Sequence, residues 1–200
     1  MRILMTGGSG LLGRNLKIEA DRPTHSDLNI LYSIDSKPYD LIIHAAAFTD
    51  TIRSETDRLE CFDVNVRGTL NLLIAYPNTP FVFISTEYAK NPANFYSLTK
   101  SLAEQLVTTH PNYLIIRTLF KSRPWKYEYA FNDVFTLGGY VENVAPLIDK
   151  AIQDWNRKDS GLIYVGDGRG EKSMLDLARE TKVDVKANSK NDKKGIIISK

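Results

Sequence analysis

The sequence predicts an α/β protein built on a doubly wound parallel sheet, with a reduced lobe at its C-terminal end. Apolar runs typical of buried strands alternate with helical stretches over more than a hundred residues, as in βαβ crossovers. A glycine-rich turn directly follows the first apolar run, and beyond Thr118 the alternation loosens. We therefore expect one domain over residues 1–200, with a small lobe built from about 120–140 and 162–200.

The composition is that of an ordinary globular protein, with 42% hydrophobic and 25% charged residues. The net charge of +2 gives no reason to predict a nucleic-acid partner. No apolar run reaches membrane-spanning length, and the chain opens on a strand instead of an apolar leader. A single cysteine, Cys61, and three scattered histidines argue against disulfides and a metal site. We expect a cytoplasmic protein that binds no nucleic acid, membrane or metal.

The opening stretch, MRILMTGGSGLLG, carries the strongest local signal. Its apolar residues 3–5 precede three glycines at three-residue spacing: Gly7, Gly10 and Gly13. A strand that runs through a glycine turn into a helix offers free N–H groups to an anion, and glycine lets a diphosphate approach the backbone. The pattern predicts a dinucleotide site and a short helix over 11–17, with a ligand-free glycine turn as the alternative.

The remaining elements are predicted from the hydrophobic pattern and from the glycine, proline and other turn residues between apolar runs. Near-continuous apolar runs predict buried parallel strands, and these are residues 41–47, 80–85, 113–117 and 162–165. The predicted helices are 28–36, 54–75, 95–107, 141–155 and 173–181. Ser54 is a candidate cap of the longest helix because acidic residues follow it. Residues 18–29 leave room for one short strand at most.

A second chemical signal lies in the helix over 95–107, where Tyr96 and Lys100 stand four residues apart and share one face. Ser85 and Thr86 end a predicted parallel strand, where ligand sites of α/β sheets form. Reduction of a ketone needs a proton donor beside the carbonyl oxygen, and a lysine cation lowers the pKa of a neighbouring phenol. The alternative is an exposed Tyr–Lys pair without function. Together with the glycine turn, the pair favours an active site.

With these motifs in order, the chain resembles the short-chain dehydrogenase/reductase superfamily. The resemblance is strongest to its extended, sugar-nucleotide branch and, within it, to the dTDP-4-dehydrorhamnose reductase group. The matching stretches are TGGSGLLG (6–13), HAAAFTD (44–50), NVRGT (65–69), STEY (85–88), YSLTK (96–100), IRT (116–118) and GGYVENV (138–144). The resemblance implies a Rossmann-type sheet, NAD or NADP as the reduced hydride donor, and a nucleotide-sugar substrate.

The resemblance also assigns roles to individual positions. The implied cofactor contacts are Gly7, Gly10, Leu11, Leu12, Gly13, Asp27, Leu28, Ala45, Ala46, Ala47 and Asn65, the last of these supporting the site from the central helix. The implied catalytic residues are Thr86 or Ser85, Tyr96 and Lys100, with Tyr96 and Lys100 also touching the cofactor. Tyr88 is a predicted substrate contact. Arg123 and Trp125 would form a phosphate-binding and stacking surface, or else belong to a solvated aromatic loop.

Departures from the family pattern leave the reaction open. Residues 14–39 are too few for a full second strand and its flanking helices. Asp21 would favour NAD there, whereas Arg22 or Lys17 would favour NADP. The chain is shorter than extended members, with most of the loss in substrate-binding parts. We rank three functions: a nucleotide-sugar reductase, an epimerase with tightly held NAD, and a silent cofactor-binding regulatory or scaffold protein. Edge strands and the aromatic loop could also serve a homodimer.

Overall fold

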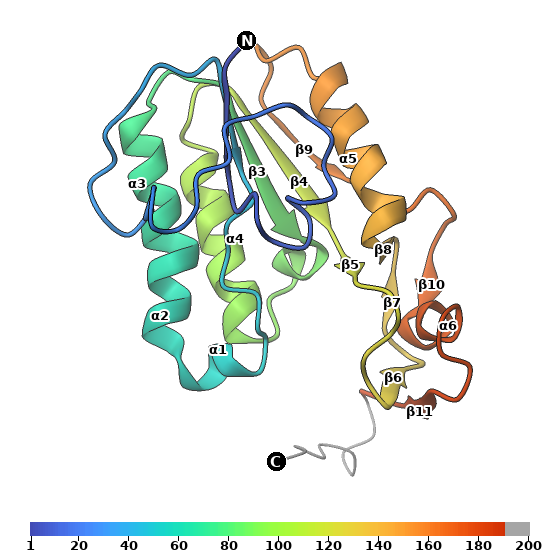
Figure 1. Ribbon diagram of the computed structural model, residues 1–200. Coiled ribbons are helices and arrows are strands. Elements are labelled where there is room, and N and C mark those ends of the chain that lie inside the picture. Colours follow the sequence, from blue (N-terminus) through green and yellow to red (C-terminus); the bar gives the residue numbers. More distant parts are fainter. Residues whose placement is uncertain (191–200) are drawn as a thin grey trace.

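The computed structural model describes residues 1–190 and centres on a sheet of five parallel strands (Figure 1). The strands lie in the order β1-β2-β3-β4-β9. They span Ile3–Thr6 (β1), Leu41–His44 (β2), Phe81–Thr86 (β3), Tyr113–Thr118 (β4) and Gly161–Tyr164 (β9). The predicted parallel α/β fold is confirmed, and β9 forms an edge of the main sheet instead of part of the lobe.

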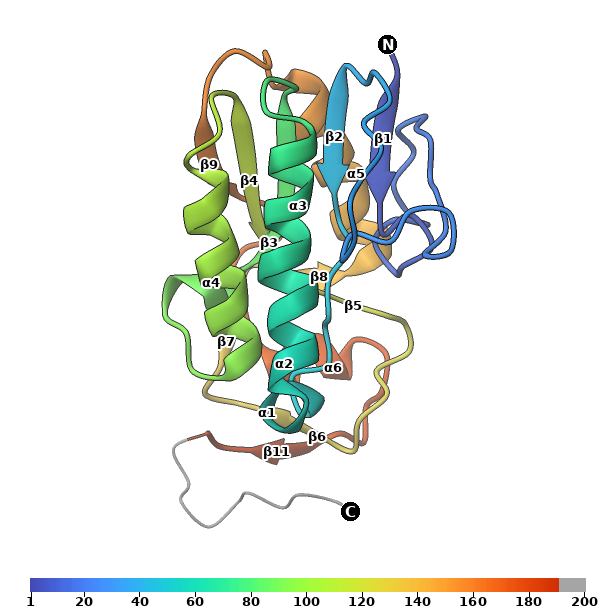
Figure 2. The same ribbon diagram turned by 90° about the vertical axis from the view of Figure 1, so that its left-hand side faces the viewer.

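Helices cover both faces of this sheet. On one face lie α1 (Arg53–Thr56), α2 (Arg58–Phe62), a π-helical turn (Asp63–Arg67), α3 (Gly68–Ala75) and α4 (Phe95–Val107). The other face carries α5 (Val141–Asp154), which stands behind the strands in Figure 2. Successive strand residues point to opposite faces of the sheet, and each face has its own apolar core. Met5 and Ile43 pack on the α5 side, while Leu4 and Ile42 pack on the α3–α4 side.

Three predicted helices have bounds in the structure that agree with the sequence to within about two residues. The helix predicted over 95–107 has these limits in the structure, because Asn94 and Ser97 form a capping box at its start. The helices predicted over 141–155 and 173–181 appear as α5 and as α6 (Met174–Arg179), which begins after its cap, Ser173. A 3-10 turn over Glu87–Lys90 connects β3 toward α4.

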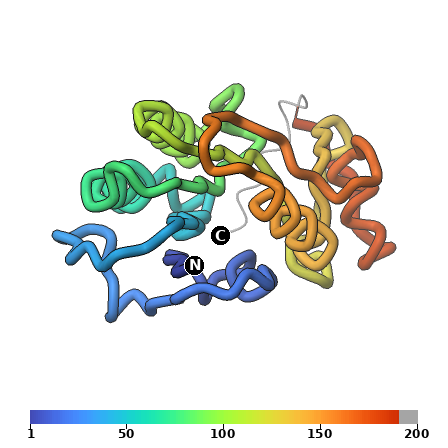
Figure 3. Tube along the Cα trace, turned by 90° about the horizontal axis from the view of Figure 1, so that it is seen from above, coloured from blue at the N-terminus to red at the C-terminus, as the bar shows by residue number. Residues whose placement is uncertain are grey.

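The segment between β1 and β2 is irregular, and Figure 3 shows it in blue along one side of the molecule. The expected short second strand is reduced to a single parallel bridge between Leu4 and Asp21. The helix predicted over 28–36 is absent. There, the Asn29 side chain accepts from the backbone N–H of Leu31 and so competes with helical pairing. The helix predicted over 11–17 is likewise only a set of turns.

The helix predicted over 54–75 is broken into shorter pieces. Asp57, with φ −99° and ψ 48°, separates α1 from α2, and the π-helical turn precedes α3. Ser54 does not cap the helix. Its hydroxyl donates to the Thr51 carbonyl and accepts from the backbone N–H of Tyr96, so it ties this segment to α4. Leu59, which the helical pattern placed toward the core, is 75% exposed.

A small lobe is formed by residues 119–140 together with 166–190, below α5 in Figure 1. It contains three two-stranded pairs: β5 (Phe120–Lys121) with β8 (Gly139–Tyr140), β6 (Tyr129–Phe131) with β11 (Lys186–Asn188), and β7 (Phe135–Thr136) with β10 (Lys172–Ser173). Tyr140 and Trp125 are buried in its own apolar cluster with α6. Across residues 1–190, no helix is long and apolar enough to span a membrane.

Candidate active site

A cleft of about 680 Å³ opens at the carboxyl ends of the first four strands of the sheet. One half is lined by the glycine turn and the loop after β2, and the other half by β3, α4 and the start of the small lobe. The carboxyl edge of a parallel sheet is the usual ligand site in this architecture. The cleft therefore joins the two sequence signals, the glycine turn and the Tyr–Lys pair, in a single site.

The glycine turn is closely packed against the loop after β2. Gly7 has a φ of +71°, and a side chain there would overlap the backbone of Ala45 and Ala46. A side chain on Gly13 would overlap the backbone of Gly7 and Gly8. These positions accept only glycine without movement of the backbone. Predicted cofactor contacts that line the cleft here are Gly7, Gly10, Leu11, Leu12, Gly13, Ala45, Ala46 and Ala47.

The charged residues considered for cofactor selection lie outside the cleft lining. Arg22 donates its guanidinium N–H groups to the carbonyls of Gly13, Leu16 and Ile18, bracing the turn from outside. Asp21 pairs with Arg2 at 3.2 Å. The backbone N–H of Lys17 donates to Asp149 on α5.

Near the glycine turn, the cleft is lined instead by Ser9, Pro23 and His25. None of these three is a carboxylate, a lysine or an arginine. Leu28 also lines the cleft, whereas Asp27 does not. The Asp27 carboxylate is exposed, and it accepts hydrogen bonds from the backbone and the hydroxyl of Thr24, which lower its pKa. Of these two implied cofactor contacts, the structure thus brings only Leu28 to the cleft.

Thr86, Tyr96 and Lys100 all line the cleft, but Ser85 and Thr86 have different surroundings. The Thr86 hydroxyl lies near the Tyr96 phenol and lowers its pKa, against the larger effect of burial. The Ser85 hydroxyl instead donates to Glu104 at 2.5 Å, and Glu104 also accepts two hydrogen bonds from Arg117. Of the two candidate hydroxyls, the geometry therefore favours Thr86 as the partner of Tyr96.

Burial controls the acid–base properties of the Tyr–Lys pair. Desolvation raises the pKa of Tyr96 to about 12 and lowers the pKa of Lys100 to about 7. The Lys100 ammonium donates to the Ile84 carbonyl at 2.8 Å and lies 4.0 Å from the centroid of the Phe83 ring. The expected lowering of the Tyr96 pKa by Lys100 is absent from this arrangement, because burial is the largest influence on both groups.

A buried network supports the site from behind. Asn65 lies in the π-helical turn, and its side chain bonds both backbone groups of Phe48 and the hydroxyl of Thr99 on α4. The Thr99 hydroxyl in turn donates to the Tyr96 carbonyl. Asn65 thus links the loop after β2 to the helix that carries Tyr96. It lies behind the cleft and is not part of its lining, so the structure does not place Asn65 among the cofactor contacts.

His44 extends this network to the first strand. The Thr69 hydroxyl donates to the Asn65 carbonyl, so its oxygen accepts from His44 Nε2, and His44 Nδ1 accepts from Thr6. Burial lowers the His44 pKa to about 3, so the ring is neutral. His44 is therefore a buried supporting residue. The sequence reasoning missed Thr6, Thr69 and Thr99, for which threonine alone gave no signal.

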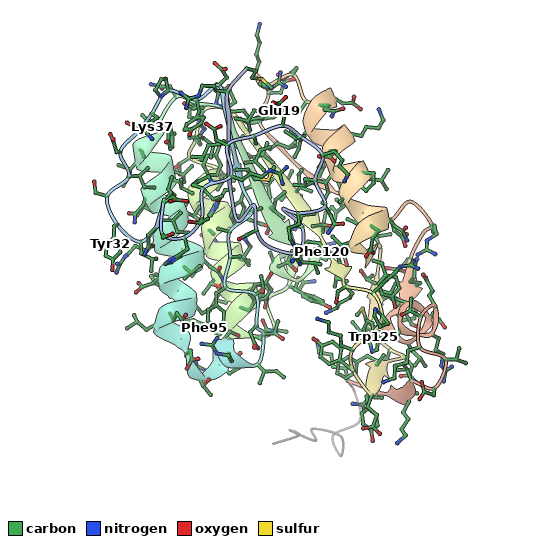
Figure 4. The ribbon with its side chains drawn as sticks, viewed as in Figure 1. Glu19, Tyr32, Lys37, Phe95, Phe120 and Trp125 are labelled. Carbon is green, nitrogen blue, oxygen red and sulfur yellow. The ribbon has the colours of Figure 1, made fainter. Side chains whose placement is uncertain are left out.

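On the lobe side, Tyr88 and Trp125 line the cleft, and Arg123 does not. Arg123 lies over the Tyr140 ring, 4.5 Å from its centroid, and 3.8 Å from Glu142. The cations that the lobe brings to the cleft are Lys121 and Lys126, which the sequence reasoning missed. Figure 4 labels Phe120 and Trp125 on this side, and Phe95 at the start of α4 across from them.

The described residues fit a dinucleotide. None of the residues lining the cleft is an aspartate or a glutamate, which suits a ligand that carries phosphates. The glycine turn leaves a cradle that side chains would fill. At the end of β4, the buried Thr118 hydroxyl lines the cleft without a protein partner. A buried hydroxyl without a partner is costly, and a bound ligand would satisfy it.

The parallel sheet, the glycine turn and the Tyr–Lys pair together define a protein of the short-chain dehydrogenase/reductase type. Residues 1–193 match the family described as the RmlD substrate binding domain, and the chain belongs to this family. A curated relative, the dTDP-4-dehydrorhamnose reductase of Aggregatibacter actinomycetemcomitans, is 30% identical over 174 residues, which cover 71% of this chain. The match spans 58% of that relative's length.

Solved structures share the fold. A dTDP-4-dehydrorhamnose reductase from Clostridium acetobutylicum superposes with a TM-score of 0.78 at 24% identity, over 94% of this chain and 83% of the other. The Bacillus anthracis enzyme in complex with NADP superposes with a TM-score of 0.76 at 21% identity, over 94% and 82%. MoeE5 in complex with UDP-glucuronic acid and NAD gives 0.73 at 16% identity, over 94% and 86%. The predicted fold and family are thereby confirmed.

Proposed function

We propose that the protein is an NAD(P)-dependent oxidoreductase that reduces a keto group on a nucleotide-activated sugar. The observation that carries this proposal is that Thr86, Tyr96 and Lys100 line the same cleft as the glycine turn. The family and the curated dTDP-4-dehydrorhamnose reductase relative support a sugar-nucleotide substrate. Structural neighbours in complex with NADP and with NAD support the cofactor class.

The chain's residues divide the work between binding and proton transfer. A bound nicotinamide dinucleotide would supply the hydride. Gly7, Gly10 and Gly13 would hold its diphosphate, as the resemblance implies, and Lys100 would hold its ribose. Tyr96, protonated at neutral pH, would give its phenolic proton to the carbonyl oxygen of the substrate. Thr86 would fix the orientation of the Tyr96 hydroxyl.

The assignment of Tyr96 rests on its protonation state as well as its position. A phenol with a pKa of about 12 is fully protonated at neutral pH, so it can donate without a prior uptake step. Lys100, with a pKa of about 7, exchanges protons readily at the same pH. We propose that Lys100 returns a proton to Tyr96 after each turnover. Lys100 then takes up a proton from water that enters the cleft when product leaves.

An absorbance assay tests the proposed reaction. Purified protein is mixed with NADPH or NADH and a dTDP-4-keto-6-deoxy sugar, and loss of reduced nicotinamide is followed. Stoichiometric loss is the expected result and identifies the preferred cofactor. Conversion of the sugar without net loss would replace the reductase by an epimerase. Cofactor binding without any conversion would favour a regulatory or scaffold protein.

We also propose the cellular setting that follows from the sequence. The one cysteine, Cys61, is buried and free, as suits a reducing cytoplasm. A second copy of the chain is a candidate source of further substrate contacts, because the lobe is short. The molecular mass in solution, measured with and without substrate, tests for such a homodimer.

A further inference from the structure

The cleft carries positive charge at the end opposite the glycine turn. Two lysines of the lobe, Lys121 and Lys126, line it there. None of the other described residues that line the cleft is a carboxylate that would neutralise them. A cofactor diphosphate on the glycine turn would leave this second positive region unused. The cleft is therefore built for two separate anionic groups.

Lys121 is the better placed of these two cations. Its side chain is half-buried, whereas Lys126 is exposed. The Lys121 ammonium lies 6.0 Å from the Trp125 ring centroid and 5.9 Å from that of Tyr127. Within residues 1–190 it has these ring contacts but no hydrogen bond or ion pair. Burial without an anion lowers its pKa, so an anionic ligand would relieve an energetic cost.

Trp125 adds a second unpaired donor. Its side chain is 6% exposed, and its indole Nε1 is buried without a hydrogen-bond partner in the described chain. The indole N–H can only donate, so the missing partner is an acceptor. The residue is held in place because its backbone N–H donates to Thr181 and its ring packs edge-on against Tyr127 at 5.6 Å. A cation and a side chain with an unpaired N–H donor are thus neighbours in the cleft lining.

We propose that Lys121 and the Trp125 indole N–H bind an oxyanion of the substrate, either a phosphoryl group of the nucleotide or a carboxylate on the sugar. This inference rests on the proposed function, since it names part of the substrate site. It replaces Arg123, whose guanidinium lies over Tyr140 and near Glu142, outside the cleft lining. The rings of Trp125 and Tyr127 lie beside the Lys121 ammonium and would flank the anion.

Calorimetric binding of nucleotides to the full chain, saturated with NADP⁺, tests the proposal without turnover. The probes are thymidine diphosphate, uridine diphosphate and thymidine, measured with the wild type, Lys121→Met and Trp125→Phe. We expect Lys121→Met to weaken diphosphate binding about ten- to hundredfold. Trp125→Phe keeps a ring but loses the N–H, and should weaken binding several-fold. Neither variant should change thymidine binding or the affinity for NADP⁺.

Matched controls and two further ligands complete the experiment. Lys150→Met on α5 removes the same charge from an exposed surface pair and should leave diphosphate affinity unchanged. UDP-glucose and UDP-glucuronic acid distinguish the sources of the anion. Equal losses for both in Lys121→Met identify the phosphoryl group, and a loss for the glucuronic acid alone identifies a carboxylate. Weaker wild-type binding in high salt gives a readout that needs no variant.

Three results would overturn the proposal. These are failure of both diphosphates to bind the wild type, full affinity in Lys121→Met, and a loss confined to Arg123→Met. Because binding is measured apart from turnover, the two proposals fail separately. A diphosphate that binds through Lys121 to a protein without reductase activity would remove the proposed function and keep this site. Normal reductase kinetics with Lys121→Met would keep the proposed function and remove this anion site.

Discussion

His44 shows how a single residue depends on the surrounding threonines. A buried imidazole needs a partner for each nitrogen, and Thr6 and Thr69 supply them at 2.7 and 3.0 Å. Because the pKa is lowered to about 3, the folded protein resists protonation of this ring. The unfolded chain, with an ordinary histidine pKa near ~6.5, takes up that proton first.

The lowered His44 pKa predicts a pH dependence of stability. Between pH 6.5 and 3 the unfolded state binds the extra proton, so stability falls as the pH falls through this window. Between pH 7 and 5 the loss due to His44 should be about 2 kcal/mol. Urea unfolding at both pH values checks this, with His44→Asn as the comparison. An equal pH effect in the variant would show that other groups cause the loss.

Lys100 predicts a pH dependence of the same sign in a more alkaline window. Its pKa is depressed to about 7 in the fold, so the unfolded chain binds more protons between pH 7 and 10.5. Wild-type stability without cofactor should therefore rise as the pH rises through this range. Lys100→Met should remove this rise, stabilise the protein at pH 7 by about 1 to 3 kcal/mol and abolish activity. Thermal unfolding at pH 7 and 9 measures it, and a less stable variant would contradict the account.

At the scale of elements, one buried ion pair fastens α4 to the sheet. Glu104 on α4 accepts two hydrogen bonds from Arg117 on β4 and a third from Ser85 on β3. The Glu104 side chain is 7% exposed and that of Arg117 is 14% exposed. This arrangement fixes the helix that carries Tyr96 and Lys100 against the strand that carries Thr86.

Breaking this pair should be costly. Glu104→Ala leaves the Arg117 guanidinium buried without its anion, and we expect a loss of about 3 kcal/mol in unfolding free energy. The exposed pair of Lys150 and Asp154 is the control, and Lys150→Ala should cost less than about 1 kcal/mol. Guanidinium unfolding curves provide both values. Equal effects of the two substitutions would contradict a structural role for Glu104.

The sequence predicted those elements whose local signals agree with their packing. β3 and β4 are uninterrupted apolar runs, and α4 has a capping residue, Asn94, at its start. The helix over 54–75 was predicted as continuous because its apolar spacing hides the break at Asp57 and the π-helical turn. That turn carries Asn65 and serves the site, as irregular helical turns often do.

At the scale of the whole molecule, the small lobe meets the sheet beside the end of β3. Glu87 directly follows Thr86, and its carboxylate accepts from the Thr136 hydroxyl of β7 at 2.7 Å. Burial raises the pKa of this carboxyl group. The contact joins the lobe to the end of β3, where the proposed catalytic hydroxyl of Thr86 lies.

Loss of this contact should weaken the binding of substrate more than the binding of cofactor. Thr136→Val keeps the shape but removes the hydroxyl, and we expect KM for the sugar nucleotide to rise several-fold with an unchanged Kd for NADP⁺. Steady-state kinetics and cofactor titration measure the two quantities. A matched surface change, Thr108→Val on the C-terminal end of α4, should alter neither. A shift in cofactor affinity with unchanged KM would contradict the proposed position of the lobe.

The lobe was the least predictable part of the molecule. Its strands are two or three residues long, too short to show a period of two. The sequence analysis selected Arg123 as the cation of the cleft. Contacts with Tyr140 and Glu142 hold Arg123 outside the cleft lining, where Lys121 lies instead, and these tertiary contacts cannot be predicted from local sequence. By contrast, the glycine turn and the Tyr–Lys pair follow from motifs whose spacing is set by local geometry. The end of the predicted lobe, 191–200, lies outside the described residues.

Transfer of hydride in a single turnover, measured beside cofactor affinity for wild type and Tyr96→Phe, tests the central claim most directly. The assay uses NADPH labelled with deuterium at the reactive carbon and a dTDP-4-keto-6-deoxy sugar. We predict deuterium at the former carbonyl carbon in the wild type. Tyr96→Phe should slow the transfer about a hundred- to ten-thousandfold without weakening cofactor binding. Transfer at the wild-type rate in Tyr96→Phe would contradict the account.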